Sequence, residues 1–168
     1  MWKLLGACLI GAGAMWTGAG KRGELRERVR ALEQMQEGLT LLCHELEWDA
    51  PPLPELMERL QQGSRGSARA LFSDCARALE RLDEHSFPQL WEQLLKRRGE
   101  LGEDVRHLHL LGGVLGRGDV AQQQHAARCC RDQIARALER AREREGTLGR
   151  LYQMVSLSGG AFLVILLL

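Results

Sequence analysis

Both ends of the chain lack charged residues over lengths close to the thickness of a lipid bilayer. No charged residue lies between Leu4 and Gly20, and the final stretch from Leu151 is also uncharged and ends in aliphatic side chains. A bilayer core of about 30 Å is crossed by about 20 apolar helical residues, with about 17 as the lower limit. The sequence therefore predicts a transmembrane helix at each end, over residues 1–20 and 151–168.

Basic residues flank both predicted spans on the side of the central region. Lys21 and Arg22 follow the first span, and Arg150 precedes the second. Further arginines continue this pattern at Arg26, Arg28, Arg30, Arg136, Arg140, Arg142 and Arg144. Lys and Arg are enriched next to spans on the cytoplasmic side. We therefore expect residues 21–150 to face the cytoplasm at the inner membrane, with both termini on the opposite side.

The N-terminal segment has a second interpretation as a processed signal. Ala12-Gly13-Ala14 has the small-x-small form of a signal-peptidase site. Cleavage there leaves a tail-anchored interaction or regulatory protein with one span. A lipoprotein site at Cys8 is disfavoured, because the residues before it are too few for a charged region and an apolar region.

The first half of the central region has a helical repeat of apolar residues. Leucines recur every seven positions, with other apolar residues on the same side: Leu25, Val29, Leu32, Met35, Leu39, Leu42 and Leu46. This pattern predicts an amphipathic helix over residues 22–48. Pro51 and Pro52 end it, because proline lacks an amide proton and restricts the residue before it. Pro54 suits the first turn of a second helix that reaches about Leu60.

Four more helices are predicted after a turn-rich break at residues 63–67. Their apolar positions are Leu71, Cys75, Leu79 and Leu82 for the third, Phe87, Leu90, Trp91 and Leu94 for the fourth, Leu101, Val105, Leu108, Leu111 and Leu115 for the fifth, and Ala127, Cys130, Ile134, Ala137, Leu138 and Ala141 for the sixth. Ser86 is the expected N-cap of the fourth helix. Period-two alternation is missing and Val and Ile are scarce, which disfavours strands. The predicted fold is all-α, a bundle of about six helices flanked by the two spans.

The most motif-like stretch is the corner before the sixth helix. Gly116 has the position of a left-handed C-cap. Asp119 has the position of the next N-cap, with Gln122 three residues on to complete a capping box. The functional alternative is that this corner is a docking surface with Arg117 exposed at its tip.

Charge and motifs argue against nucleic-acid binding and catalysis. Lys and Arg number 23 against 22 Asp and Glu, so the basic excess typical of nucleic-acid binders is missing. Phosphate-binding loops, nucleophile elbows and metalloprotease motifs are also missing from the sequence. We expect a protein that is not an enzyme, with no cofactor and no small-molecule substrate.

The cysteines and histidines leave one catalytic alternative open. His125 and Cys129 are four residues apart, so on a helix they share a face. With Cys130 they define the rival hypothesis of a small metal or thiol enzyme, although two or three such residues do not make a zinc site. A disulfide between the adjacent Cys129 and Cys130 is strained, so the odd set of 5 cysteines indicates reduced thiols in the cytosol.

Several short segments, in their order and spacing, resemble the stage III sporulation protein AB family. They are Lys21-Arg22 after the first span, Leu41-Leu42, Glu45-Leu46, Pro52-Leu53-Pro54-Glu55-Leu56, Leu115-Gly116 with Asp119 and Gln123, and the aliphatic terminus from Leu163 to Leu168. The chain departs from the family pattern at Gly118, where Ser or Thr is usual, and at Val120 and Ala121, where charged residues are common.

The resemblance implies a membrane component of the channel-like complex between mother cell and forespore. The family is also similar to the cytoplasmic F domain of type II secretion systems, an all-helical platform. This similarity implies docking of the complex's cytoplasmic ATPase, stage III sporulation protein AA, in the mother cell. Gly116, Arg117, Asp119 and Gln123 are the partner-facing patch that we predict for this contact.

Overall fold

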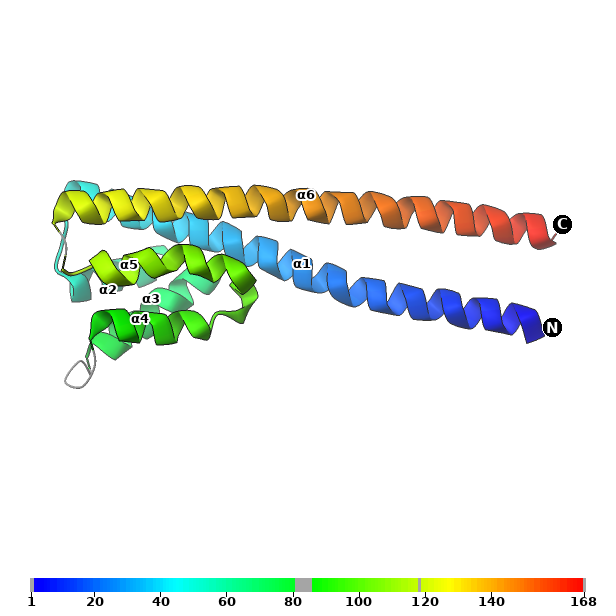
Figure 1. Cartoon of the computed structure of the whole chain (residues 1–168), viewed down its shortest axis with the longest axis horizontal. Coiled ribbons are helices and arrows are strands. Elements are labelled where there is room, and N and C mark those ends of the chain that lie inside the picture. The colour runs from blue at the N-terminus through cyan, green and yellow to red at the C-terminus, as the bar shows by residue number, and fades with distance from the viewer. Residues whose placement is uncertain (1, 81–85, 118, 168) are drawn as a thin grey trace. The chain divides into compact units, whose positions relative to one another are not determined.

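A computed structural model describes the backbone of residues 2–80, 86–117 and 119–167, and the side chains of 23–80, 86–117 and 119–147. Every regular element in these ranges is a helix (Figure 1). The helices are α1 (Trp2–Trp48), α2 (Leu53–Gly63), α3 (Gly66–Leu79), α4 (Phe87–Lys96), the 3₁₀ segment η1 (Gly99–Leu108), α5 (His109–Val114) and α6 (Val120–Leu167). The predicted all-α fold is confirmed over the described residues.

The chain divides into two compact units, and α1 and α6 contribute to both. The bundle unit comprises Arg28–Glu139, and the terminal unit comprises Met1–Glu27 with Arg140–Leu168. Within the terminal unit, Arg26 Nε lies 3.3 Å from Glu145 Oε1 in an ion pair.

The predicted spans fall in the first part of α1 and the last part of α6. Residues 1–20 and 151–168 lie outside the described side chains, as do Lys21, Arg22 and Arg150. Among the residues that the structure describes, no helical stretch combines the length and apolarity that crossing a membrane requires. The two spans therefore stay predictions.

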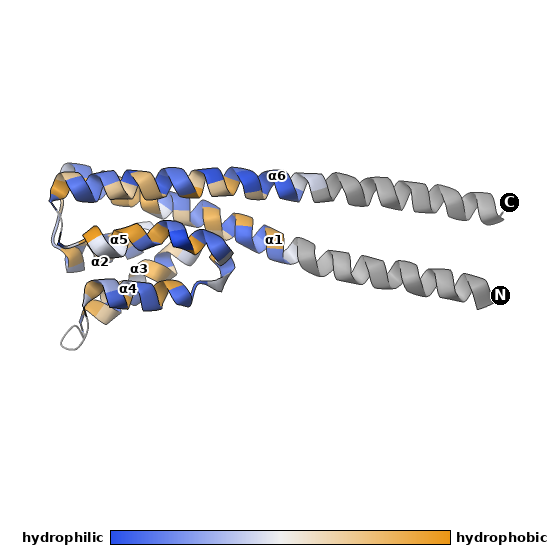
Figure 2. Ribbon diagram, viewed as in Figure 1, coloured by the Kyte–Doolittle hydropathy of each residue, from blue (hydrophilic) through white to orange (hydrophobic). Residues whose placement is uncertain are grey.

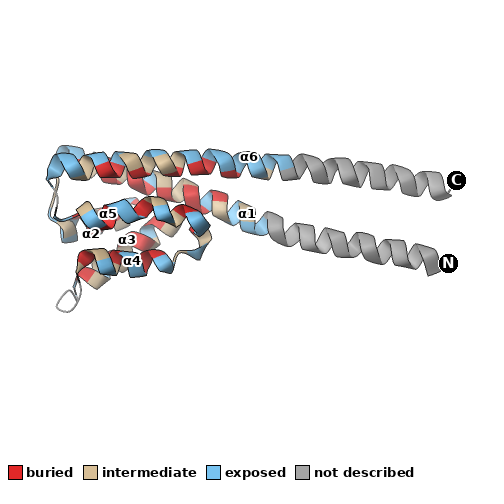
Figure 3. Cartoon of the chain, viewed as in Figure 1, coloured by how far each residue is buried: buried red, intermediate tan, exposed pale blue. Residues whose placement is uncertain are grey.

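The apolar face of α1 lies in the core of the bundle unit, as its leucine repeat predicts. Its buried side chains are Val29, Ala31, Leu32, Met35, Leu39, Leu42, Cys43 and Leu46. On α6 the buried positions in this unit are mostly small side chains, with two larger aliphatic ones: Ala126, Ala127, Cys130, Ile134, Ala137 and Leu138. Figures 2 and 3 show that apolar, buried positions alternate with polar, exposed ones along each helix. Both helices therefore present one stripe to the core and the rest to water.

Helices α2 and α3 pack on α1 at very short range. A Cβ at Gly38 would lie 2.7 Å from Ala68 Cβ, so glycine permits this close approach. Gln34 Oε1 of α1 accepts a hydrogen bond of 2.9 Å from the Ser67 amide in the first turn of α3. The turn-rich break between these helices is shorter than the predicted residues 63–67, since α2 continues to Gly63 and α3 already begins at Gly66.

The predicted start of α4 is confirmed. Ser86 is its N-cap, and the Ser86 amide donates to Gln89 Oε1 at 3.4 Å as part of a capping box. Phe87, Trp91 and Leu94 are buried as predicted. The indole Nε1 of Trp91 donates a buried hydrogen bond of 2.8 Å to the carbonyl of Leu108.

The fifth helix is not the continuous α-helix that we predicted. It is divided into η1 and α5, and Gly102 inside η1 has φ +56° and ψ −134°. Glycine adopts such a conformation readily, whereas residues with a Cβ do not. The apolar positions Leu101, Leu108 and Leu111 are nevertheless buried, so the prediction had the right side chains in the core and the wrong backbone.

A polar network holds η1 against both long helices. The guanidinium of Arg28 on α1 donates to Asp104 Oδ2 from Nη2 at 2.6 Å and from Nε at 3.2 Å. The His107 ring Nδ1 lies 2.6 Å from Gln133 Oε1 on α6. His107 Nε2 also lies 3.9 Å from Asp104 Oδ1. Asp104 is one of two buried polar residues in the described ranges, and this network supplies the partners that a buried carboxylate requires.

Candidate functional site

The predicted corner begins where α5 ends. Leu115 is buried and extended, with φ −62° and ψ 128°, and its amide donates to the Leu111 carbonyl at 2.9 Å. Gly116 follows with φ +77°, which confirms the predicted left-handed position after the helix. The chain therefore turns sharply at the residue that sequence reasoning singled out.

Leu53 at the start of α2 covers this turn. A Cβ at Gly116 would lie 3.0 Å from Leu53 Cδ2 and 3.6 Å from Leu53 Cβ. Glycine is required here by its positive φ and by the lack of space. The contact fixes the corner against the first turn of α2.

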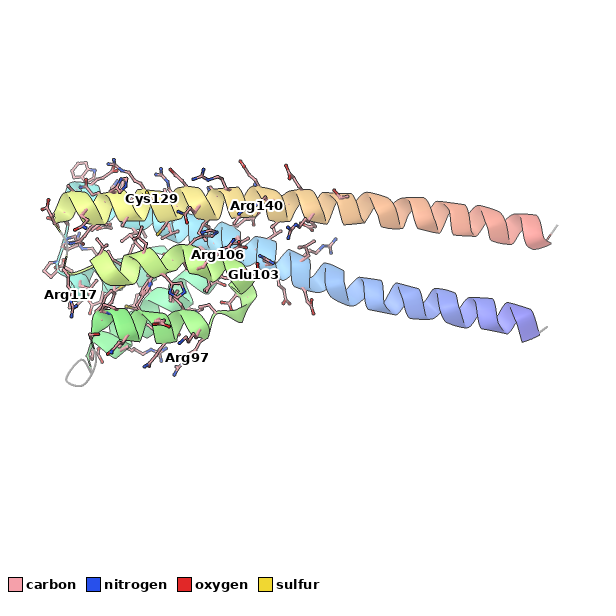
Figure 4. All side chains as sticks on the ribbon, viewed as in Figure 1. Arg97, Glu103, Arg106, Arg117, Cys129 and Arg140 are labelled. Atoms are coloured by element: carbon pink, nitrogen blue, oxygen red, sulfur yellow. The ribbon has the colours of Figure 1, made fainter. Side chains whose placement is uncertain are left out.

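Arg117 is the most accessible polar group of the predicted patch. Its backbone amide donates to the Val114 carbonyl at 3.3 Å, so the main chain is held. Its side chain is exposed, and it makes no ion pair with any side chain in the described ranges. Figure 4 shows Arg117 at the α5–α6 corner. A fixed backbone with a free guanidinium suits recognition of a partner carboxylate.

Asp119 and Gln123 support the start of α6. Asp119 Oδ1 accepts from the Val120 amide at 2.8 Å, and the Asp119 carbonyl accepts from the Gln123 amide at 2.9 Å. The carboxylate thus binds an amide at the helix N-terminus, where negative charge is favoured. The predicted capping box of Asp119 with Gln122 is not found among the described residues, since the Asp119 carboxylate binds the adjacent Val120 amide. Of the predicted patch, Arg117 alone presents an uncommitted charge.

The next residues of α6 are joined to the last turn of α1. Gln124 Nε2 donates to the Leu46 carbonyl at 2.8 Å. Arg128 Nη2 lies 2.8 Å from Glu47 Oε1. These contacts place the corner and the end of α1 at the same end of the bundle unit. Sequence reasoning missed both pairs, because their partners are far apart in the chain.

Two large apolar side chains are exposed at this end. Trp48, the last residue of α1, is 82% exposed, and Val120, the first residue of α6, is 42% exposed. Neither was a predicted site residue. The sequence holds a partial signal for Trp48 alone, which stands out of register with the leucine repeat at the last position of α1.

The histidines and cysteines do not gather around a common point. His125 Nε2 lies 3.6 Å from Cys129 Sγ, as their spacing predicts. Cys43 and Cys130 are buried, and burial is the main cause that raises the pKa of Cys130 to about 12. Within the described part of the chain, no three His, Cys, Asp or Glu side chains are placed to hold a metal ion. The rival enzyme hypothesis therefore gains no support from this geometry.

Fold and site together define a class of protein, an all-helical bundle that includes segments of two long helices and has an exposed corner between α5 and α6. The sequence profile of stage III sporulation protein AB matches residues 3–168. The chain belongs to the stage III sporulation protein AB family, and this membership gives it a role in sporulation.

A solved structure described as stage III sporulation protein AB has a similar fold. The TM-score is 0.61 at 21% sequence identity, and the match covers 72% of this chain and 98% of that chain. At this identity the likeness concerns the fold alone. No curated protein sequence matches the chain significantly.

Proposed function

We propose that this chain is a non-enzymatic membrane component of the channel-like complex between mother cell and forespore. Its ends anchor it in the mother-cell membrane, and its bundle unit lies in the cytoplasm. There it docks the cytoplasmic ATPase of the complex, stage III sporulation protein AA, in the manner of a type II secretion F platform. The chain holds the ATPase at the membrane, and the ATPase supplies the energy.

The observation that carries this proposal is the exposed, unpaired Arg117 on a corner with a fixed backbone. Gly116 is held under Leu53, and Asp119 binds the amide at the start of α6. The backbone of this corner is therefore already ordered, and binding of a partner to the guanidinium costs it little further conformational freedom. Family membership supports the sporulation setting.

The other parts of the proposal follow from the sequence. The arginine-flanked uncharged ends support two membrane anchors and a cytoplasmic bundle. The lack of a phosphate-binding motif makes an external ATPase necessary if the complex does mechanical work. The balanced charge supports protein partners over nucleic acid.

Co-purification of the ATPase from sporulating cells tests the docking corner. Arg117→Glu reverses the only uncommitted charge of the predicted patch, so we expect capture to fall at least tenfold. Arg97→Glu is the matched control, because Arg97 is also exposed but lies after α4 (Figure 4). Both variants should keep the helical circular dichroism of the unaltered chain. Equal capture by the two variants would remove the corner from the account.

A further inference from the structure

The last turn of α1 leaves an aromatic ring in water. The indole of Trp48, 82% exposed, stacks on the imidazole of His44 with centroids 6.2 Å apart and an interplanar angle of 11°. His44 is itself exposed. One face of the indole therefore lies against His44, and the other face is open. This arrangement is not needed for the core, which contains neither ring.

A cluster of acidic side chains lies where the end of α1 meets α2. One guanidinium, Arg59 on α2, is shared by three carboxylates, at 2.6 Å from Glu55, 3.0 Å from Glu45 and 3.2 Å from Asp49. Hydrogen bonds that Arg59 donates to these carboxylates, above all to Glu55, raise the pKa of Arg59. One positive charge therefore stands against three carboxylates, and the cluster has a negative surplus. Glu45 lies one helical turn before Trp48, the spacing of neighbours on a helix surface, and Asp49 is the residue that follows Trp48. Two of the three carboxylates therefore come from residues close to Trp48 in the chain.

The neighbouring charges do not cancel this surplus. Glu47 and Arg128 form a balanced pair at 2.8 Å. The corner contributes Arg117 and Asp119, one charge of each sign. The surface around Trp48 is therefore aromatic and acidic, and it selects for a partner of opposite charge.

We propose that Trp48 and the Arg59 carboxylate cluster bind a basic segment of a partner protein. A guanidinium or ammonium group of that segment stacks on the open face of the indole, because the ring face attracts cations. Adjacent basic side chains of the segment contact Glu45, Asp49 and Glu55. This inference deepens the proposed function by giving the chemistry of the docked segment, and it rests on that function for the identity of the partner.

Photocrosslinking in sporulating cells tests the occupant directly. Trp48 is replaced with p-benzoylphenylalanine in the full-length chain, and the matched control carries the same group at Leu110, which is 49% exposed on α5. We expect crosslinks from position 48 to a protein segment rich in Lys and Arg. Raising the salt concentration from about 0.1 M to about 1 M should reduce their yield, because the screening length falls from about 10 Å to about 3 Å.

Several outcomes would overturn the inference. They are a crosslink to a second copy of this chain, a crosslink to lipid, a crosslinked segment without clustered basic residues, and a yield no greater than that from position 110. Each means that this surface has another occupant or none.

Capture of the ATPase separates this inference from the proposed function. Trp48→Ala should lower capture about tenfold, a typical effect for an interface tryptophan, and Trp48→Phe should restore most of it. Asp49→Lys should lower capture as well, with helical circular dichroism unchanged. If Arg117→Glu lowers capture and Trp48→Ala does not, the aromatic surface is refuted and the corner stands. If neither variant lowers capture, both proposals fail.

Discussion

The Arg28–Asp104 pair gives a quantitative prediction about the stability of the bundle unit. Its two side chains differ in exposure, 31% for Arg28 and 9% for Asp104. Removing one partner of a fully buried ion pair costs about 3–5 kcal/mol, because the other charge stays buried without compensation. Arg28→Ala leaves such a buried carboxylate, so we expect a loss of about 3 kcal/mol. Asp104→Ala leaves a guanidinium that reaches water, so we expect a loss of about 1–2 kcal/mol.

Urea unfolding of the full-length chain in detergent, followed by far-ultraviolet circular dichroism, measures these losses. The free energy of unfolding comes from the midpoint and the slope. The double variant Arg28→Ala, Asp104→Ala completes the cycle, and we expect it to be less destabilised than the sum of the single variants. A larger loss for Asp104→Ala than for Arg28→Ala, or strict additivity, would refute the argument from unequal burial.

Three further predictions concern packing, backbone and thiols. Gly112→Ala should cost about 1–3 kcal/mol, since its Cβ would lie 2.6 Å from Trp91 Cδ1; an unchanged urea midpoint contradicts this contact. Gly116→Ala should cost about 1–2 kcal/mol because φ is +77°, again read from the midpoint. Burial raises the pKa of Cys75 to about 12, so Cys75 stays a thiol at pH 8. Iodoacetamide should therefore modify the half-buried Cys129 before Cys75, and peptide mass spectrometry measures the order. Rapid labelling of Cys75 in the native chain would contradict its burial.

The helices could be predicted from sequence where local signals agree. The leucine repeat of α1 and its proline-marked end gave the helix terminus at Trp48. Ser86 marked the start of α4. Gly116 was correctly predicted to be left-handed, because glycine after a helix commonly adopts that conformation. Each of these signals depends on residues only a few positions apart.

The remainder depends on contacts between distant residues. The kink at Gly102 could not be predicted, because a single glycine inside an apolar repeat is also compatible with a continuous helix. The Arg28–Asp104 pair joins residues 76 positions apart, and charged residues with helical spacing usually face solvent. Trp48 stands out of register with the leucine repeat, but only the packed bundle shows that its ring is left in water.

The candidate site was predicted in part. Sequence reasoning placed Gly116 and Asp119 at the corner and left Arg117 exposed, and the structure has them there. It gave no indication that Gln124 and Arg128 join this corner to the end of α1. These two bonds bring the aromatic surface and the corner to one end of the bundle unit, which no local pattern specifies.

The central claim is that the two uncharged ends lie in the membrane while the bundle unit faces the cytoplasm. Labelling with a membrane-impermeant maleimide tests this claim. Each variant of the chain has one cysteine, at position 2, at position 168 or at the natural Cys129, and its other cysteines are replaced with serine. We expect reagent outside intact cells to label positions 2 and 168, and Cys129 to react only after the membrane is opened. Labelling of Cys129 in intact cells, or release of the chain from membranes by alkaline carbonate, would contradict the account.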